Sequence, residues 1–316
     1  MQLHPKKWYQ RSVIKNISMD GTQMEQILSG KTIVITGATS GIGLAAAEIA
    51  ARKGAAVIGI GRSPERCRQA EARLRAFNPA ASSKYLTADL SIQSQVRSLA
   101  PRIQLLLEEA GRPGLDGLVN NAGTFSYYLS FSPEGFELQW AVNHLAPFLL
   151  THDLLPLLQA ASAGRIVTVS SESHRDTRLN WDDIQLRRHY NGLRAYQQTK
   201  LANVLFTLEL NRRLGAGSGV RAFAADPGLV KTEIGFKGTP ALVRWVWGWR
   251  RSAGDAPELP AAWIVYLLSE PSLQQSPEIY WRGGVPKPAS RFALDAQSAR
   301  RLWALSAQMC GLESEA

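Results

Sequence analysis

The chain has few of the residues that build disulfide frameworks or metal sites. Its 316 residues include only 2 cysteines and 5 histidines. Cys67 and Cys310 stand far apart, and the histidines follow no metal-ligand spacing. We therefore expect neither a disulfide scaffold nor a zinc site. The low cysteine content also predicts a reducing, cytoplasmic location.

Long apolar runs are lacking as well. The longest candidate, Leu145–Ala163, is interrupted by prolines, a histidine and an aspartate. It falls short of the roughly 18–20 continuous apolar residues that a membrane-spanning helix needs. The segment before Asn16 is basic but has no apolar stretch of the kind found in signal peptides. We expect neither a transmembrane helix nor a signal peptide.

Acidic residues are outnumbered, with 26 Asp and Glu against 36 Lys and Arg, which gives a formal net charge of +10. An excess of this sign suits nucleic acids or anionic membranes. However, the basic residues are scattered along the chain and no nucleic-acid-binding motif is present. We attribute the excess positive charge to basic side chains on solvated helix faces and to a site that binds an anionic small molecule. We expect no nucleic-acid partner.

What the sequence does have is a regular alternation of strand and helix patterns. Strands are expected at Thr32–Thr36, Ala56–Ile60, Lys84–Thr87, Gly117–Asn120, Arg165–Ser170, Val220–Ala225 and Ile279–Trp281. Helices are expected at Gly41–Arg52, Pro64–Phe77, Ser91–Ala110, Phe136–Ala163 and Ala195–Leu214. Apolar strands joined by helices predict an α/β fold, a doubly wound (Rossmann) parallel sheet of about seven strands with helices on both faces. We expect one domain over residues 29–316, preceded by an extension of residues 1–28.

A glycine turn, Thr36–Gly43, follows the first expected strand and opens into a helix. A side chain at Gly37, Gly41 or Gly43 would obstruct the turn, a bound phosphate or the packing of the helix on the strand. The free N–H groups at the start of the helix attract an anion. The turn therefore predicts a site for a dinucleotide phosphate.

The end of the second expected strand indicates which dinucleotide binds. A site for NAD needs a carboxylate there to bind the ribose 2′-hydroxyl. This strand ends instead in Gly61-Arg62-Ser63. The guanidinium of Arg62 suits a 2′-phosphate, and Ser40 and Ser63 can add hydrogen bonds. We therefore predict NADP(H) over NAD(H).

Chemistry is expected at Tyr196 and Lys200, which are four residues apart and so share one face of a helix. An ammonium beside a phenol favours the phenolate, so we expect the Tyr196 pKa to fall below its usual value of about 10. Such a tyrosine can exchange a proton with an alcohol or carbonyl oxygen. Ser170 and Ser171 close a central strand, where a serine can hydrogen-bond a substrate carbonyl or simply cap a turn.

These motifs, in this order, resemble the short-chain dehydrogenase/reductase family over about Ser29 to Trp281. The matching elements are the Thr36–Gly43 turn, Asp89, Asn120–Gly123, Asn143, Ser171, Tyr196, Lys200 and Pro227–Thr232. Within the family, Val142–Thr151 and Ala299–Ser306 resemble the retinol dehydrogenase-like and WW-domain-oxidoreductase-like branch.

The resemblance implies roles for the matching residues. Tyr196 would be the general acid/base, Lys200 would lower its pKa and bind the nicotinamide ribose, Ser171 would hold the substrate oxygen, and Asn143 would support a proton relay through water. Asp89 would contact the adenine. The implied cofactor-binding residues are Gly37, Thr39, Ser40, Gly41, Ile42, Gly43, Arg62, Asp89, Leu90, Asn121, Ala122, Gly123, Tyr196, Lys200, Pro227, Gly228, Val230 and Thr232. Thr199 and Thr168 depart from the usual serine and asparagine of the family, but neither change removes a catalytic group.

Residues 235–260 interrupt the alternation and contain Trp245, Trp247 and Trp249 beside several arginines. Three interpretations stay open: a substrate lid, a patch that makes weak contact with a membrane surface, or simple packing on the domain. Aromatic residues elsewhere can complete a bulky apolar pocket, and the alternative for each is plain packing: Phe125, Tyr127, Tyr128, His174 and Tyr190.

Together these features predict an NADP(H)-dependent oxidoreductase that transfers hydride between the nicotinamide and a bulky lipophilic ketone, aldehyde or alcohol. One alternative is a dinucleotide-binding redox sensor or scaffold with little turnover; another is reduction of a carbon–carbon double bond. The family often forms oligomers through the helices expected at Phe136–Ala163 and Ala195–Leu214, so a homodimer stays open.

Overall fold

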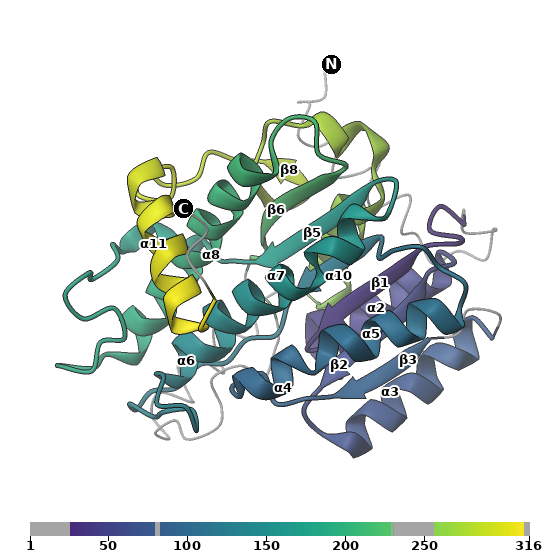
Figure 1. The fold of residues 1–316 in the computed structure, drawn as a ribbon, viewed down its shortest axis with the longest axis horizontal. Coiled ribbons are helices and arrows are strands. Elements are labelled where there is room, and N and C mark those ends of the chain that lie inside the picture. Colours follow the sequence, from purple (N-terminus) through teal and green to yellow (C-terminus); the bar gives the residue numbers. More distant parts are fainter. Residues whose placement is uncertain (1–25, 80–82, 229, 231–255, 313–316) are drawn as a thin grey trace.

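An eight-stranded sheet runs through the middle of the molecule (Figure 1). This computed structural model describes residues 26–79, 83–228, 230 and 256–312. The strands, in chain order, are β1 (Thr32–Thr36), β2 (Ala56–Gly61), β3 (Lys84–Thr87), β4 (Gly117–Asn120), β5 (Gly164–Val169), β6 (Val220–Asp226), β7 (Tyr280–Arg282) and β8 (Val285–Pro286). All seven predicted strands are confirmed to within one residue at each end. The short β8 was not predicted, because two residues that include a proline carry no strand pattern.

The strand order is β3-β2-β1-β4-β5-β6-β7-β8, and every pair is parallel except the antiparallel β7–β8 pair. The direction of winding reverses between β1 and β4, which are paired with Ile35 opposite Val119. In sheets of this kind ligands bind at the carboxyl ends of the strands where this reversal occurs. The doubly wound α/β fold is therefore confirmed, and it brings the ends of β1 and β4 together.

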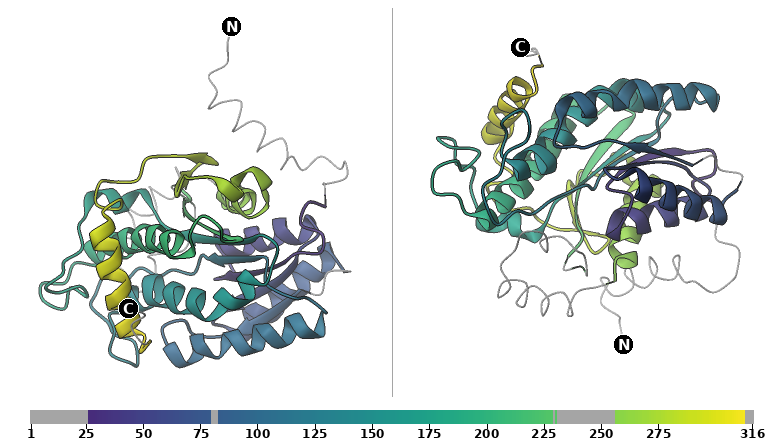
Figure 2. Two further views of the ribbon diagram at one scale, coloured as in Figure 1. Left: turned by 45° about the horizontal axis from the view of Figure 1, so that its top comes forward. Right: turned by 90° about the horizontal axis from the view of Figure 1, so that it is seen from below.

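Helices cover both faces of the sheet (Figure 2). One layer contains α2 (Gly41–Arg52), α3 (Pro64–Phe77) and α10 (Glu258–Ser269); the other contains α4 (Gln93–Arg97), α5 (Leu99–Glu109), α7 (Ala146–Gln159) and α8 (Gly192–Leu214), with α11 (Ala296–Met309) packed on α8. Strand alternation separates the two cores: Ile33 and Ile35 pack in the first layer, whereas Val34 packs in the second. Each face of the sheet is thus buried, as the apolar strands predicted.

Three helix predictions need correction at their boundaries. The helix expected over Ser91–Ala110 is divided at Ser98 into α4 and α5, because Pro101 lacks the N–H that would continue the hydrogen-bond ladder. The helix expected over Phe136–Ala163 consists of α6 (Leu138–Trp140), a π-helical turn over Ala141–Leu145, and α7. The helix expected from Ala195 begins three residues earlier, at Gly192, where the Asn191 side chain accepts a hydrogen bond from the Arg194 N–H at 3.0 Å.

The amino-terminal edge of the domain includes residues before Ser29. Leu28 is buried in the first core, and its N–H donates to the Lys53 carbonyl at 2.9 Å. Gln26 Nε2 donates to the Arg52 carbonyl at 3.1 Å. The boundary expected after residue 28 therefore lies inside the domain, while residues 1–25 lie outside the described part of the chain. Among the described helices, none has the length and apolar character to span a bilayer.

Candidate active site

The glycine turn after β1 makes the close contacts that its composition predicted. Gly37 and Gly41 adopt positive φ angles of 66° and 54°. A Cβ on Gly43 would lie 2.3 Å from the Gly37 carbonyl oxygen and 2.4 Å from Asn121 Nδ2. Ser40 precedes α2 without making a side-chain cap, and the first turn carries no acidic residue. The N–H groups of that turn are thus available to an anionic ligand.

Thr36 joins this turn to the loop after β4. Its Oγ1 donates to the Val119 carbonyl at 3.2 Å and accepts hydrogen bonds from the N–H groups of Asn121 and Ala122, both at 3.0 Å. Asn121 Nδ2 donates in return to the Thr36 carbonyl at 2.9 Å. Thr36 is therefore a positioning residue. It was recognised as part of the glycine turn, but its role was not predicted, although the hydroxyl directly before the glycines was visible in the sequence.

Two further strand ends border the expected dinucleotide site. Arg62 is exposed after β2, and a Cβ on Gly61 would lie 2.4 Å from Thr39 Cγ2, so the glycine turn packs against this strand end. After β3, the half-buried Asp89 accepts hydrogen bonds from the N–H and Oγ of Ser91 at 2.9 and 2.8 Å. Leu90 lines a small hollow with the polar Thr36 and Asn120 and with apolar side chains that include Ala122 and Val142. These predicted residues are thus brought to one edge of the sheet.

Tyr196 and Lys200 lie on one face of α8, as their spacing predicted. Lys200 is buried, its Nζ lies 5.3 Å from the centroid of the Tyr196 ring, and it donates to the Val169 carbonyl at 3.1 Å. Phe125 approaches the other side of the site, with its ring 5.9 Å from that of Tyr196 in an edge-to-face arrangement. The loop after β4 therefore meets α8 at the phenol.

The expected direction of the Tyr196 pKa is wrong for the described structure. Burial, with a smaller effect from the Asp226 charge, raises the pKa of Tyr196 to about 12. Burial lowers the pKa of Lys200 to about 8. Desolvation penalises the charged form of each group, and the ammonium is directed at a carbonyl rather than at the phenol.

Ser171 both caps a turn and presents a hydroxyl. It precedes the 3₁₀ turn Glu172–Asp176, and its Oγ accepts a hydrogen bond from the Ser173 N–H at 3.3 Å. Ser170 connects this segment to the tyrosine helix, because its Oγ donates to the Lys200 carbonyl at 2.8 Å. The cap is therefore confirmed. The Ser171 hydroxyl proton is not used by it, and the hydrogen bond to a substrate carbonyl stays a prediction.

Asn143 occupies the π-helical turn and is buried. Its Oδ1 accepts from the Thr124 N–H at 2.7 Å, and its Nδ2 donates to Thr199 Oγ1 at 3.2 Å. Thr199 Oγ1 donates in turn to the Tyr196 carbonyl at 2.7 Å. Thr199 therefore retains the hydroxyl of the serine that it replaces, and it links Asn143 to the tyrosine helix.

Of the residues expected to line an aromatic pocket, Phe125 lies beside Tyr196, and the pocket itself stays a prediction. His174 is completely buried beneath Ser171, and its Nδ1 lies 2.8 Å from the Ser171 carbonyl oxygen. Tyr190 donates to the buried carboxylate of Glu137 at 2.9 Å, so its polar end is held within the fold. Both are structural because they satisfy buried polar groups. Tyr127 and Tyr128 are exposed on the loop after β4.

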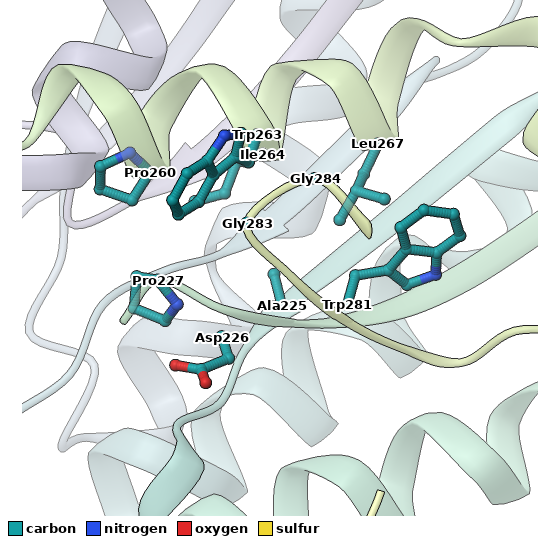
Figure 3. A pocket seen from close by; sticks show the side chains of 10 residues that line it. All are labelled: Ala225, Asp226, Pro227, Pro260, Trp263, Ile264, Leu267, Trp281, Gly283 and Gly284. Atoms are coloured by element: carbon teal, nitrogen blue, oxygen red, sulfur yellow. The ribbon is translucent and has the colours of Figure 1, made fainter. Parts of the chain in front are cut away.

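At the end of β6 lies a buried carboxylate that the sequence motif did not single out. Asp226 accepts a hydrogen bond from the Gly228 N–H at 2.9 Å and another from the Tyr280 hydroxyl at 3.0 Å. The next residue, Pro227, faces Pro260 and Trp263 of α10 across a small hollow, whereas the Asp226 carboxylate points away from them (Figure 3). Among the described residues, the hollow holds about 10 Å³, room for one water molecule at most.

The structure describes only some of the remaining predicted residues. Val230 is half-buried against the first core, whereas Thr232 and the tryptophans Trp245, Trp247 and Trp249 lie outside the described residues. Within the described ranges, no group of three histidine, cysteine or acidic side chains could hold a metal ion.

The fold agrees with comparisons to known proteins. Residues 31–240 match the family model for short chain dehydrogenases. The chain belongs to the short-chain dehydrogenase family. Human retinol dehydrogenase 13 is 38% identical over 300 residues, covering 91% of this chain and 86% of the relative. Human retinol dehydrogenase 14 is 36% identical over 305 residues, covering 90% and 88%.

Solved structures agree with this short-chain dehydrogenase fold. An uncharacterised protein from Mycobacterium paratuberculosis superposes with a TM-score of 0.67 at 33% identity, covering 92% of this chain and 99% of that one. A short-chain dehydrogenase from Shigella flexneri, complexed with NADP, gives a TM-score of 0.63 at 23% identity, covering 83% and 100%, a likeness that shows the fold alone. This short-chain dehydrogenase is thus an oxidoreductase of the retinol dehydrogenase-like branch that uses a nicotinamide dinucleotide on alcohol or carbonyl groups.

Proposed function

We propose that this enzyme transfers hydride between NADP(H) and a bulky lipophilic ketone, aldehyde or alcohol. The observation that carries the proposal is the placement of Tyr196 and Lys200 on one face of α8, beside the ends of β4 and β5. Relatives named retinol dehydrogenases support a substrate of retinoid-like size and polarity.

The residues at the strand ends fit a dinucleotide. Gly43 leaves space that a Cβ would fill, and the uncapped start of α2 can receive the pyrophosphate. Asp89 would contact the adenine, Lys200 the nicotinamide ribose, and Pro227–Gly228 the nicotinamide. When bound, the dinucleotide supplies or accepts the hydride.

The protein's own groups handle the substrate oxygen and its proton. The Ser171 hydroxyl would donate a hydrogen bond to that oxygen. With a pKa of about 12, Tyr196 holds its proton at neutral pH and can pass it to the oxygen during reduction; oxidation reverses the transfer. The nearby Lys200 ammonium would stabilise the phenolate that remains, and Asn143 would hold a water through which the proton is replaced.

The preference for the phosphorylated dinucleotide rests on Arg62. It is exposed at the end of β2, where no carboxylate in Gly61–Ser63 would bind a ribose 2′-hydroxyl or repel a 2′-phosphate. A guanidinium matches a phosphate with two parallel hydrogen bonds.

A substrate screen with both dinucleotides tests the proposal. We expect turnover of apolar ketones, aldehydes or alcohols, with a higher kcat/KM for NADPH than for NADH. Dinucleotide binding without turnover of any compound would favour the redox sensor or scaffold instead. Product analysis separates carbonyl reduction from reduction of a carbon–carbon double bond.

Cytoplasmic location and a homodimer remain predictions for this enzyme. One structural feature bears on the second: α11 packs against α8, and His144 Nε2 lies 2.8 Å from Ser306 Oγ between them. A partner that used the face of α8 beneath α11 would have to displace this helix. Light scattering of the purified protein would measure the oligomeric state.

A further inference from the structure

His174 connects the catalytic serine segment to the carboxy-terminal part of the chain. Its Nδ1 lies 2.8 Å from the Ser171 carbonyl oxygen, and its Nε2 accepts a hydrogen bond from the Ser290 N–H at 3.1 Å. Because a carbonyl can only accept, Nδ1 carries the proton and Nε2 keeps its lone pair. The ring is therefore a neutral imidazole with both nitrogens in use.

Tyr280 makes a second connection from β7. It is buried, and its hydroxyl donates to Asp226 Oδ2 at 3.0 Å. Asp226 Oδ1 accepts the Gly228 N–H at 2.9 Å. One side chain of β7 thus holds the carboxylate that orients the Pro227–Gly228 segment.

The two connections meet each other. The rings of His174 and Tyr280 lie 4.7 Å apart at an interplanar angle of 57°. Arg282, also on β7, pairs with Glu172 at 2.7 Å and with Asp226 at 3.4 Å. Segments that follow β5 and β6 are therefore both held by the β7–β8 hairpin and the residues just after it.

We propose that the β7–β8 hairpin is a positioning element of the active site, in which His174 sets the position of Ser171 and Tyr280 sets that of Gly228. This inference rests on the proposed roles of Ser171 and of Pro227–Gly228. Neither His174 nor Tyr280 contacts the reacting atoms. His174 acts through its hydrogen bond to the Ser171 carbonyl, and Tyr280 acts through Asp226, which accepts the Gly228 N–H. The two residues should therefore affect different kinetic constants.

The test uses two substitutions that keep the aromatic pair. Tyr280→Phe removes the one hydrogen bond to Asp226, and His174→Phe removes the hydrogen bonds to both Ser171 and Ser290. We expect His174→Phe to lower kcat about tenfold while the dinucleotide KM changes less than about twofold, since only the lost hydrogen bond to Ser171 bears on the serine and one buried hydrogen bond is commonly worth about a factor of ten. We expect Tyr280→Phe to raise the dinucleotide KM and Kd about five- to tenfold, with kcat at saturation nearly unchanged. His174→Gln, which restores an amide donor and acceptor, should recover part of the lost kcat.

Trp281→Phe is the matched control, because Trp281 neighbours Tyr280 on β7 but packs in the core on the opposite face of the sheet. It should lower thermal stability without moving kcat or KM. Equal changes of kcat and KM in both test variants, or the same changes in the control, would show a merely structural role and overturn the proposal.

Two measurements need no turnover and so separate this proposal from the proposed function. Fluorescence titration gives the dinucleotide Kd of Tyr280→Phe, and a crystal structure of His174→Phe shows whether the Ser171 peptide has moved. An unchanged Kd together with an unmoved Ser171 would reject the positioning role, even if the substrate screen had already rejected carbonyl reduction.

Discussion

The dinucleotide half of the site and its catalytic half are built in opposite ways. At the turn between β1 and α2, the structure depends on side chains that are missing: a Cβ at Gly43 would lie 2.3 Å from a backbone oxygen. At the ends of β5 and β6, it depends on buried polar side chains whose hydrogen-bond partners lie within the fold. Ser170 donates to the Lys200 carbonyl, and Asp226 accepts from Tyr280.

This difference decides how each half fails. The glycine turn between β1 and α2 tolerates no added atoms, because the neighbouring main chain would have to shift. A buried polar network tolerates no lost partner, because each group left unpaired pays its full desolvation cost. Substitutions that enlarge a residue should therefore damage the first half, and substitutions that delete a polar atom should damage the second.

The largest effect is expected for Tyr196→Phe, which removes the proton donor but keeps the ring beside Phe125. Turnover should fall about 10³-fold or more, in line with the usual contribution of a general acid. The dinucleotide Kd should stay within about twofold, because the glycine turn is untouched. Steady-state kinetics and fluorescence titration measure the two quantities. Tyr128→Phe, at an exposed position, is the control and should match the wild type.

How much of this could be predicted from the sequence follows the same division. The β1–α2 turn and the Tyr196–Lys200 pair are local patterns, and both were correctly placed. The contacts of His174 with Ser290 join residues 116 positions apart, and no local pattern specifies them. The direction of the Tyr196 pKa was wrong for a related reason: burial by elements distant in the sequence raises this pKa, and the Lys200 ammonium is directed at the Val169 carbonyl. The π-helical turn around Asn143 likewise leaves no periodic signal.

The next largest effect is expected for Gly43→Ala, which adds one carbon atom to the glycine turn. The Cβ would lie 2.3 Å from the Gly37 oxygen and 2.4 Å from Asn121 Nδ2, so the turn must open. Overpacking of this kind costs about 1–3 kcal/mol, and we expect dinucleotide affinity to fall at least tenfold. Gly217→Ala is the matched control, because nothing lies within 4 Å of its added carbon. A Gly43→Ala protein with the wild-type Kd would contradict the close-approach explanation.

A smaller and more selective effect is expected for Arg62→Ala. The NADPH KM should rise about tenfold while the NADH KM stays nearly constant, because only the phosphorylated ribose loses a charge-assisted partner. Arg68→Ala is the control: this exposed arginine of α3 pairs with Glu65 at 2.5 Å. An equal rise of KM for both dinucleotides would mean that Arg62 does not read the 2′-phosphate.

The smallest expected effect is a loss of folding stability at acidic pH, and it arises in the catalytic half of the site alone. His144, beside Asn143 in the π-helical turn, is completely buried, and burial lowers its pKa to about 4. The folded pKa is below the unfolded value of about 6.5, so the unfolded state takes up the proton first as the pH falls. The stability that this group contributes is therefore lost progressively between about pH 6.5 and pH 4. The loss between pH 7.5 and pH 5.5 amounts to about 1 kcal/mol.

Urea unfolding of the wild type and of His144→Asn at these two pH values measures this loss by difference. The substituted protein should be less stable at pH 7.5, because it loses the contact with Ser306, but its stability should fall less on acidification. If His144→Asn loses as much stability between pH 7.5 and pH 5.5 as the wild type, the acid sensitivity originates elsewhere. The buried histidine would then not make the catalytic half more sensitive to acid than the dinucleotide half.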